Sequence, residues 1–241
     1  MGSSPVRAVL FDLDGTLMDH DSAREIGARA QLTAWLGEGA TEEERARLQV
    51  EWARLEALHY DEYASGACSM QEHRRRRVRG MHVAVGREQP GDEAADTWFG
   101  GYLKHYRASW RPFEDALPAL QALAGTGQEV RLGVVTNGEG ESQRAKLRAI
   151  GLEDRFATVV ASGEVGVAKP RAEIFALACE RLGVDPSQAA HVGDRLDLDA
   201  EGAAAAGLRG VWLDRLGAGP GPGHVLRIAT LHELPAALSA R

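Results

Sequence analysis

Short apolar runs recur along the chain, and most of them end at a small or polar residue. They occupy residues 6–11, 130–136, 157–162, 189–193 and 210–213. Runs of this length are typical of buried strands, and most are followed by apolar residues at helical spacing. Because strands that alternate with helices pair in parallel, the pattern predicts an α/β fold with a Rossmann-like, doubly wound parallel sheet.

A long segment without strand-like runs, residues 18–111, follows the first apolar run. Its apolar side chains recur at helical intervals, as at Leu48, Trp52, Leu55 and Leu58. This spacing predicts helices with one buried face.

The helical segment interrupts the α/β pattern, so we expect a discontinuous core. Residues 1–17 and 112–241 are predicted to form the α/β core, and residues 18–111 an all-helical cap domain inserted after the first strand. The aromatic side chains of the cap are expected to fill its interior rather than to stack on a ligand. They are Trp35, Trp52, Tyr60, Tyr63, Trp98, Phe99 and Tyr102.

The cap segment also contains the basic run HRRRRVR, residues 73–79. Consecutive residues cannot share one helix face, which favours a solvated helix surface. The alternative is that one or two of the arginines among residues 74–77 face a cleft and attract small anions. His20, near the start of the segment, is expected to be solvated.

Composition narrows the possible functions. The chain has 241 residues, of which 44% are hydrophobic and 26% charged, enough for a sizeable core. Its net charge of −7 argues against a nucleic-acid polymer as partner, because non-specific binding needs a basic surface. Neither a membrane-spanning run nor a secretory signal stands out, so we expect a cytoplasmic location and no membrane partner. Cys68 and Cys179 lack disulfide or metal-ligand spacing and are expected to be reduced, buried thiols.

The first apolar run ends in VLFDLDGTL, which contains Asp12 and Asp14. Ligands of parallel sheets bind at the carboxyl ends of the strands, and alternate residues of a strand point the same way. The two carboxylates are therefore candidates for one polar site. The motif DLDG taken alone fits a turn at the end of a strand equally well.

The second apolar run ends in VVTNG, with Thr136 and Asn137 at the corresponding position. A hydroxyl followed by successive backbone N–H groups can form a nest for phosphate. Asn-Gly is also a common turn pair, so this motif is ambiguous by itself.

Lys169 directly precedes Pro170, which is expected in the first turn of a helix. A cation at the start of a helix opposes the helix dipole unless it has an anionic partner. Lysine is scarce in this chain, at three among 28 basic residues. These observations favour a functional lysine over a solvated loop residue.

The fourth run is followed by the acidic stretch DRLDLD, which contains Asp194 and Asp199. Asp199 is also a candidate cap for the helix that follows. Asp12, Asp14 and Asp194 at one sheet edge would repel each other unless a cation lay between them. Ligands that are all oxygen atoms indicate Mg²⁺.

DLDGT, VVTNG, AKP and VGDRLDLD resemble, in this order, the four motifs of the haloacid dehalogenase superfamily. The resemblance covers the predicted core, and the cap resembles the helical cap of that superfamily by position only. LGVVTNG and GLRGVWLDR are most similar to the phosphatases of this superfamily that act on nucleotides and sugar phosphates.

The resemblance implies a catalytic role for each motif. Asp12 would be the nucleophile that forms an aspartyl-phosphate, and Asp14 the general acid and then the general base. Thr136 and Asn137 would bind phosphoryl oxygens. Lys169 would bind phosphate as well and offset the charge of Asp12.

The resemblance also implies a set of Mg²⁺ ligands. They would be the Asp12 carboxylate, the backbone carbonyl of Asp14 and the Asp194 carboxylate. Asp199 would lie next to these ligands without binding the ion directly. The expected function is a Mg²⁺-dependent phosphomonoester hydrolase that acts on a small phosphorylated metabolite, such as a sugar phosphate or a nucleoside monophosphate.

Other functions remain open. A phosphomutase of the same superfamily would use the same pair of aspartates, and a non-catalytic phosphate-binding regulatory protein could have the same fold. Asp14 argues against a dehalogenase, because the dehalogenases of this superfamily lack the second aspartate. A phosphonatase would need a lysine in the cap, where Lys104 is the only one.

Overall fold

The computed structural model describes residues 5–64, 66–124 and 130–239. They divide into two units, one made of the chain up to His20 together with the chain from Trp110 on, the other of Asp21–Ser109. The outermost residues of the predicted core, 1–4 and 240–241, lie outside the described ranges.

The first unit is built on a six-stranded sheet with strand order β3-β2-β1-β4-β5-β6, in which every neighbouring pair is parallel. Its strands are β1 Ala8–Phe11, β2 Arg131–Thr136, β3 Thr158–Ala161, β4 Ala189–Gly193, β5 Arg209–Leu213 and β6 Leu226–Ile228. The five predicted runs correspond to β1 to β5. The predicted α/β fold class, a doubly wound parallel sheet, is confirmed.

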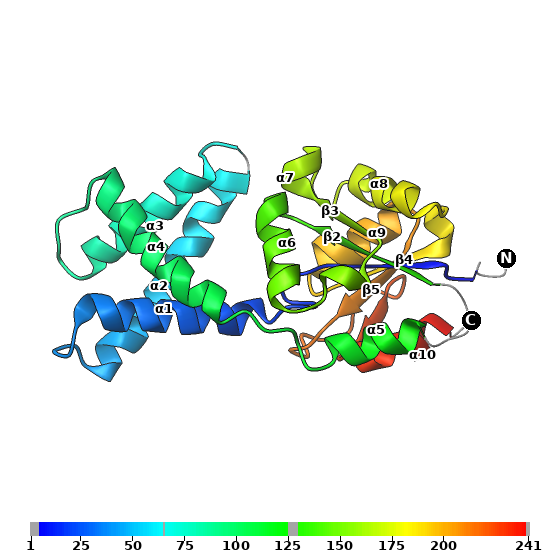
Figure 1. Cartoon of the computed structure of the whole chain (residues 1–241), viewed down its shortest axis with the longest axis horizontal. Helices are drawn as coiled ribbons and strands as arrows, with labels where there is room; N and C mark the ends of the chain where they lie inside the picture. Colours follow the sequence, from blue (N-terminus) through cyan, green and yellow to red (C-terminus); the bar gives the residue numbers. More distant parts are fainter. Residues whose placement is uncertain (1–4, 65, 125–129, 240–241) are drawn as a thin grey trace. The chain divides into compact units, whose positions relative to one another are not determined.

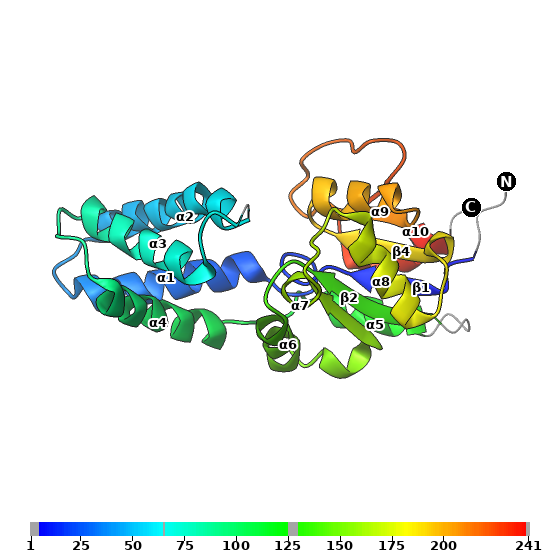
Figure 2. The same cartoon turned by 90° about the horizontal axis from the view of Figure 1, so that it is seen from above.

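Helices cover both faces of this sheet (Figures 1 and 2). On one face lie α8 (Ala172–Leu182) and α9 (Gly202–Ala205), and on the other α5 (Ala116–Ala124) and α10 (Leu234–Ser239). The apolar face of α8 packs on Leu10, Val135 and Val160 of the central strands. Strands that are covered on both faces have to be apolar throughout, which is why they appear as continuous apolar runs.

Helix α8 begins later than the sequence indicates. Pro170 does not lie in its first turn, because Arg171 has an extended backbone (φ −63°, ψ 133°) and the helix begins at Ala172. Lys169 therefore lies in the turn before the helix, rather than at its first residues.

The second unit is helical in its described residues, with α1 (His20–Leu36, from Asp21 on), α2 (Glu42–Ala64), α3 (Met70–Ala84) and α4 (Asp92–Ala108). Side-chain oxygens cap the N-terminal ends of two of these helices. Thr41 accepts a hydrogen bond from the Glu44 backbone N–H and Ser69 from that of Glu72, both at 3.1 Å. These contacts satisfy N–H groups that have no partner within the helix.

An aromatic cluster fills the interior of the helical unit. The Trp52 ring centroid lies 5.2 Å from that of Trp98 and 5.0 Å from that of Tyr102, and all three side chains are buried. The prediction of an aromatic interior is confirmed for them and for Phe99, but it is wrong for Tyr60, which is 46% exposed.

The predicted stripe on α2 is right at Leu48, Trp52 and Leu55, which are buried, and wrong at Leu58, which is exposed. At about 100° per residue, Leu58 lies about 80° around the helix axis from Leu48. The Leu58 side chain therefore lies outside the buried face of α2.

The basic run is not a simple solvated surface. The Arg77 side chain is only 3% exposed; its guanidinium lies 3.8 Å from the centroid of the Trp52 ring and donates to Glu56 at 3.1 Å. The neighbouring Arg75 pairs with two aspartates of α4, at 2.6 Å each. The expectation of a solvated face is wrong for Arg77, because ring stacking and an ion pair compensate for its burial.

Both cysteines are free thiols, as expected. Cys179 is buried, and burial raises its pKa to about 11, whereas Cys68 is only half-buried. Among the described residues, no helix combines the length and the apolar character that a membrane crossing requires.

Candidate active site

The register of the sheet places Asp12 at its carboxyl edge. Phe11, the last residue of β1, pairs with Val134 of β2 and Val192 of β4. The Asp12 backbone N–H donates to the Val192 carbonyl at 2.9 Å. Asp12 is therefore fixed between two neighbouring strands, at the edge where ligands of parallel sheets bind.

Asp194, directly after β4, is held at the same edge by its backbone. Its N–H donates to the Thr16 hydroxyl at 3.1 Å, and its carbonyl accepts a hydrogen bond from the Trp212 indole at 3.0 Å. Gly15 makes this approach possible. It has φ +88°, and a Cβ there would lie 2.6 Å from an Asp194 carboxylate oxygen. Any other residue at position 15 would be strained and would displace Asp194.

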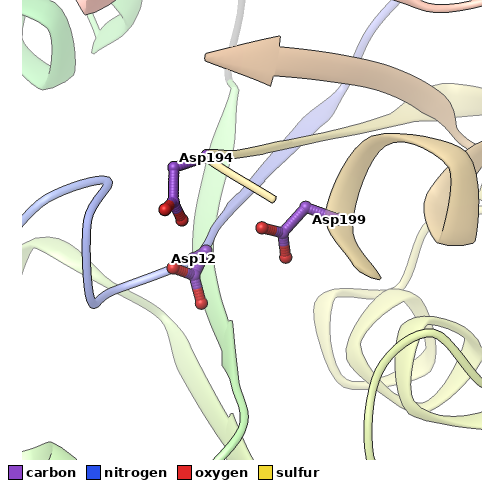
Figure 3. Close-up of side chains that lie close together, drawn as sticks. All are labelled: Asp12, Asp194 and Asp199. Carbon is purple, nitrogen blue, oxygen red and sulfur yellow. The ribbon is translucent and has the colours of Figure 1, made fainter. Parts of the chain in front are cut away.

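Three carboxylates from separate segments, Asp12, Asp194 and Asp199, converge on one point (Figure 3). One oxygen of each lies within 4.8 Å of the others. Burial raises the pKa of Asp12 to about 8, against the opposing effect of Lys169. Burial and then repulsion by Asp199 raise the pKa of Asp194 to about 6. A buried set of oxygen donors with excess negative charge fits a hard divalent cation.

Lys169 supplies the positive charge of this cluster. Its Nζ lies 2.5 Å from Asp12 Oδ1 and 2.6 Å from Asp199 Oδ1, and the side chain is buried. Burial alone would lower the pKa of Lys169, but the charges of Asp12 and Asp199 outweigh it and raise the pKa above its usual range. Lys169 thus has two buried anionic partners, although it lies in the turn before α8 and not at the start of the helix.

Asp199 is not the cap of α9, because it lies inside the preceding π-helical segment, Leu196–Glu201. Its Oδ1 binds Lys169 and lies 3.2 Å from His191 Nε2, while its Oδ2 accepts the Arg195 backbone N–H at 3.0 Å. Both oxygens are therefore occupied. Asp199 orients the Lys169 ammonium toward Asp12.

Asn137 holds the backbone of Lys169. Its Nδ2 donates to the Lys169 carbonyl at 3.1 Å, and its Oδ1 accepts the Lys169 N–H at 2.9 Å. The side-chain amide is committed to this pair of bonds. A role of Asn137 as a phosphate ligand remains a prediction, and it now rests on the backbone N–H.

Asp14 lies in a different environment from Asp12. Its Oδ2 accepts from Lys146 Nζ at 2.6 Å and from Gln143 Nε2 at 3.2 Å, and His20 Nδ1 lies 3.7 Å from its Oδ1. Burial would raise the pKa of Asp14, but the charges of Lys146 and His20 and the hydrogen bonds of Lys146 and Gln143 lower it to about 2. Gln143 Nε2 also donates to the buried Thr136 hydroxyl at 2.5 Å.

The family model for haloacid dehalogenase-like hydrolases matches residues 6–207. The chain belongs to this family. The match spans most of both units, so the resemblance seen in four short motifs is confirmed over most of the chain.

Relatives of this hydrolase include phosphatases. It is 36% identical over 211 residues to glyceraldehyde 3-phosphate phosphatase of Methanopyrus kandleri, covering 84% of this chain and 82% of that one. It is 30% identical over 249 residues to N-acylneuraminate-9-phosphatase of Rattus norvegicus, covering 100% and 96%. These findings confirm the prediction of a phosphatase-type enzyme.

A solved structure of YfnB from Bacillus subtilis, bound to magnesium, has the same fold. Its TM-score is 0.78 at 23% identity, covering 98% of this chain and 100% of that one.

The sequence reasoning missed three residues of this hydrolase's site: Gln143, Lys146 and His20. His20 was expected to be solvated, which is wrong, since it lies within ion-pair distance of Asp14. The scarcity of lysine, which singled out Lys169, applies equally to Lys146. Scarcity is the one signal in the sequence that points to Lys146, and it does not show which way the side chain turns.

Proposed function

We propose that this enzyme hydrolyses phosphomonoesters of small metabolites, with Mg²⁺, through an aspartyl-phosphate on Asp12. The observation that carries the proposal is the contrast between two neighbouring carboxylates. Asp12 lies against Lys169 and two further aspartates, whereas Asp14, two residues on, is held by Lys146 and Gln143. Distinct surroundings suit distinct roles in one reaction.

In the first step a carboxylate oxygen of Asp12 attacks phosphorus. The new O–P bond forms as the bond between phosphorus and the ester oxygen breaks. The leaving oxygen takes the proton of the Asp14 carboxyl group. An incoming phosphate favours this protonated form of Asp14, because like charges raise each other's proton affinity.

In the second step water attacks the phosphorus of the aspartyl-phosphate. Asp14, now a carboxylate, accepts a proton from this water, and the bond between phosphorus and Asp12 breaks. Inorganic phosphate leaves, the Asp12 carboxylate is restored, and Asp14 again carries the proton. The contacts of Asp14 with Lys146 and Gln143 favour the ionised state that this step requires.

The remaining residues bind and neutralise charge. The Thr136 hydroxyl and the Asn137 backbone N–H are proposed to donate to phosphoryl oxygens, and Lys169 to offset the charge on Asp12 and the phosphate. Asp12, Asp194 and the backbone carbonyl of Asp14 would hold Mg²⁺. When bound, the ion would stabilise negative charge on the phosphoryl group.

The substrate is proposed to be a sugar phosphate or a nucleoside monophosphate. Two relatives are named for phosphorylated sugars or sugar acids, which supports the first class.

A phosphomutase would use the same aspartates but return an isomer instead of inorganic phosphate. A regulatory protein would bind phosphate without turnover. The cytoplasmic location stays a prediction.

Rapid mixing with p-nitrophenyl phosphate and Mg²⁺ tests the proposal. Its acidic leaving group scarcely needs a proton, so Asp14→Asn should still form the aspartyl-phosphate but hydrolyse it about 10²- to 10⁴-fold more slowly. A burst of nitrophenolate is therefore expected for Asp14→Asn, and none for Asp12→Asn.

The metal is tested in the same assay. Excess EDTA should abolish turnover, Mg²⁺ should restore it, and Asp194→Ala should require more Mg²⁺. Full activity in EDTA, or an Asp14→Asn turnover within about tenfold of wild type, would contradict the proposed roles.

A further inference from the structure

Helix α6 (Gly140–Ala149) carries two side chains that meet the candidate site. Gln143 and Lys146 are three residues apart, so they lie on the same face of the helix. Both are buried, at 2% and 7% exposure. In the reaction described above they take no part other than their contacts with Asp14.

The two residues bind one oxygen of Asp14 and not the other. Oδ2 accepts from Lys146 Nζ at 2.6 Å and from Gln143 Nε2 at 3.2 Å. Oδ1 is shielded from solvent and has no hydrogen-bond partner among the residues that the structure describes. The carboxylate is therefore held by one oxygen, while the other keeps its capacity to bind a proton.

The same contacts determine the orientation of the Gln143 amide. A carboxylate only accepts hydrogen bonds, so the NH₂ group of Gln143 has to face Asp14. This NH₂ group also donates to the Thr136 hydroxyl at 2.5 Å. Since Thr136 Oγ1 accepts from Gln143, its own hydrogen points away from Gln143 and can be donated to another acceptor.

We infer that Gln143 and Lys146 are positioning residues of the proposed reaction. They fix Asp14 through Oδ2, so that Oδ1 is the atom that exchanges the proton, and Gln143 orients Thr136 as a donor to a phosphoryl oxygen. The inference rests on the proposed function. It predicts different kinetic effects for the two residues, because only Gln143 contacts Thr136.

The first test is Lys146→Met, which keeps the length of the side chain but removes the donor. Asp14 then loses an anchor of Oδ2, and we expect kcat for p-nitrophenyl phosphate to fall about 10- to 100-fold. A nitrophenolate burst is expected, as for Asp14→Asn, and kcat/KM should be kept, because attack by Asp12 is not affected. Lys146→Arg should recover part of kcat.

The second test is Gln143→Glu, which keeps the shape but replaces the NH₂ donor by an acceptor. The Thr136 hydroxyl would then donate to the new carboxylate. We expect KM and the inhibition constant of inorganic phosphate to rise about tenfold, together with a fall in kcat. Lys146→Met should leave the inhibition constant unchanged.

Arg148→Met is the matched control, since Arg148 lies on the same helix but is 47% exposed and pairs with Glu141 and Glu153. It should behave as wild type. Thermal unfolding of each variant gives its folded fraction, by which kcat is corrected.

Unchanged corrected kcat, KM and phosphate inhibition in Lys146→Met and Gln143→Glu would overturn the inference and leave the proposed function intact. Activity lost only in proportion to the folded fraction would overturn it as well. A wild-type enzyme that releases no phosphate from any phosphomonoester would overturn the proposed function, and this inference with it.

Discussion

The two units of the molecule use charged residues in opposite ways. In the α/β unit, Asp12, Asp194 and Asp199 gather around one lysine, and negative charge is in excess. In the helical unit, arginines of α3 pair with acidic residues of neighbouring helices, as Arg75 does with Asp92 and Asp96. The α/β unit contains a cluster of like charges, whereas the arginines of α3 are neutralised pair by pair.

This difference indicates which charged residues serve activity and which serve stability. Like charges that are buried together raise the free energy of the folded state, and such an arrangement is kept where chemistry requires it. Paired charges and a packed interior stabilise the fold without requiring a ligand. Substitutions at the carboxylate cluster should therefore change activity more than stability, and substitutions inside the helical unit should do the reverse.

The largest effect is expected for Asp12→Asn. Turnover of p-nitrophenyl phosphate should be lost, because an amide does not attack phosphorus. The free energy of unfolding in EDTA should stay within about 1 kcal/mol of wild type, because the lost contact with Lys169 is offset by relief of repulsion. Urea unfolding measures it. A much larger loss would show that Asp12 is primarily structural.

Trp52→Ala, in the helical unit, should lower stability while largely keeping activity. Its side chain is 2% exposed and contacts three aromatic rings, so the free energy of unfolding should fall by about 3–5 kcal/mol. The folded protein should still transfer the phosphoryl group of p-nitrophenyl phosphate within about tenfold of wild type. Tyr60→Ala, at an exposed position, is the control and should cost under about 1 kcal/mol. Equal losses for both substitutions would contradict the aromatic interior.

The sequence predicted those parts of the fold that a repeating pattern specifies. Buried parallel strands have to be apolar throughout, and this made β1 to β5 visible. The start of α8 depends on the backbone conformation of Arg171, and the exposure of Leu58 on how α2 is rotated. Neither is encoded in a local pattern.

The same distinction holds within the site. Asp12, Thr136 and Asp194 follow strands, and in a parallel sheet the ends of neighbouring strands must share an edge. Lys146 and Arg148 both lie in the last turn of α6, where any cation suits the helix dipole. Only packing shows that Lys146 turns inward to Asp14 while Arg148 stays exposed.

A comparison of two arginines sharpens the contrast within the helical unit. Arg77 is 3% exposed, stacks on Trp52 and pairs with Glu56, whereas Arg29 is 65% exposed in its pair with Glu42. We expect Arg77→Met to lower the free energy of unfolding by about 2 kcal/mol, and Arg29→Met to change it by less than about 1 kcal/mol. Denaturant titrations measure both. Equal values would show that burial of Arg77 contributes nothing.

The last prediction concerns a paired charge in the α/β unit, and it tests whether a charge stabilises the fold because it is paired or because of the unit in which it lies. Asp115 is buried, and both its oxygens accept from Arg215 at 2.9 Å. Burial would raise the pKa of Asp115, but hydrogen bonds from Arg215, Leu231 and Thr230 lower it below its usual value.

A carboxylate whose pKa is lowered by folding adds stability above its unfolded pKa of about 3.9, and this stability is lost as the pH falls through the folded value. Asp115→Asn should therefore cost about 1–3 kcal/mol at pH 7, and the difference from wild type should shrink below about pH 4. Urea unfolding at pH 7, 5, 4 and 3 measures it, with exposed Glu141→Gln as a control that should match wild type throughout. A difference that stayed constant down to pH 3 would mean that the shape of Asp115, and not its charge, stabilises the unit. A difference that vanishes with acid would show that the α/β unit also stabilises itself by paired charge, and that the carboxylate cluster is the exception within it.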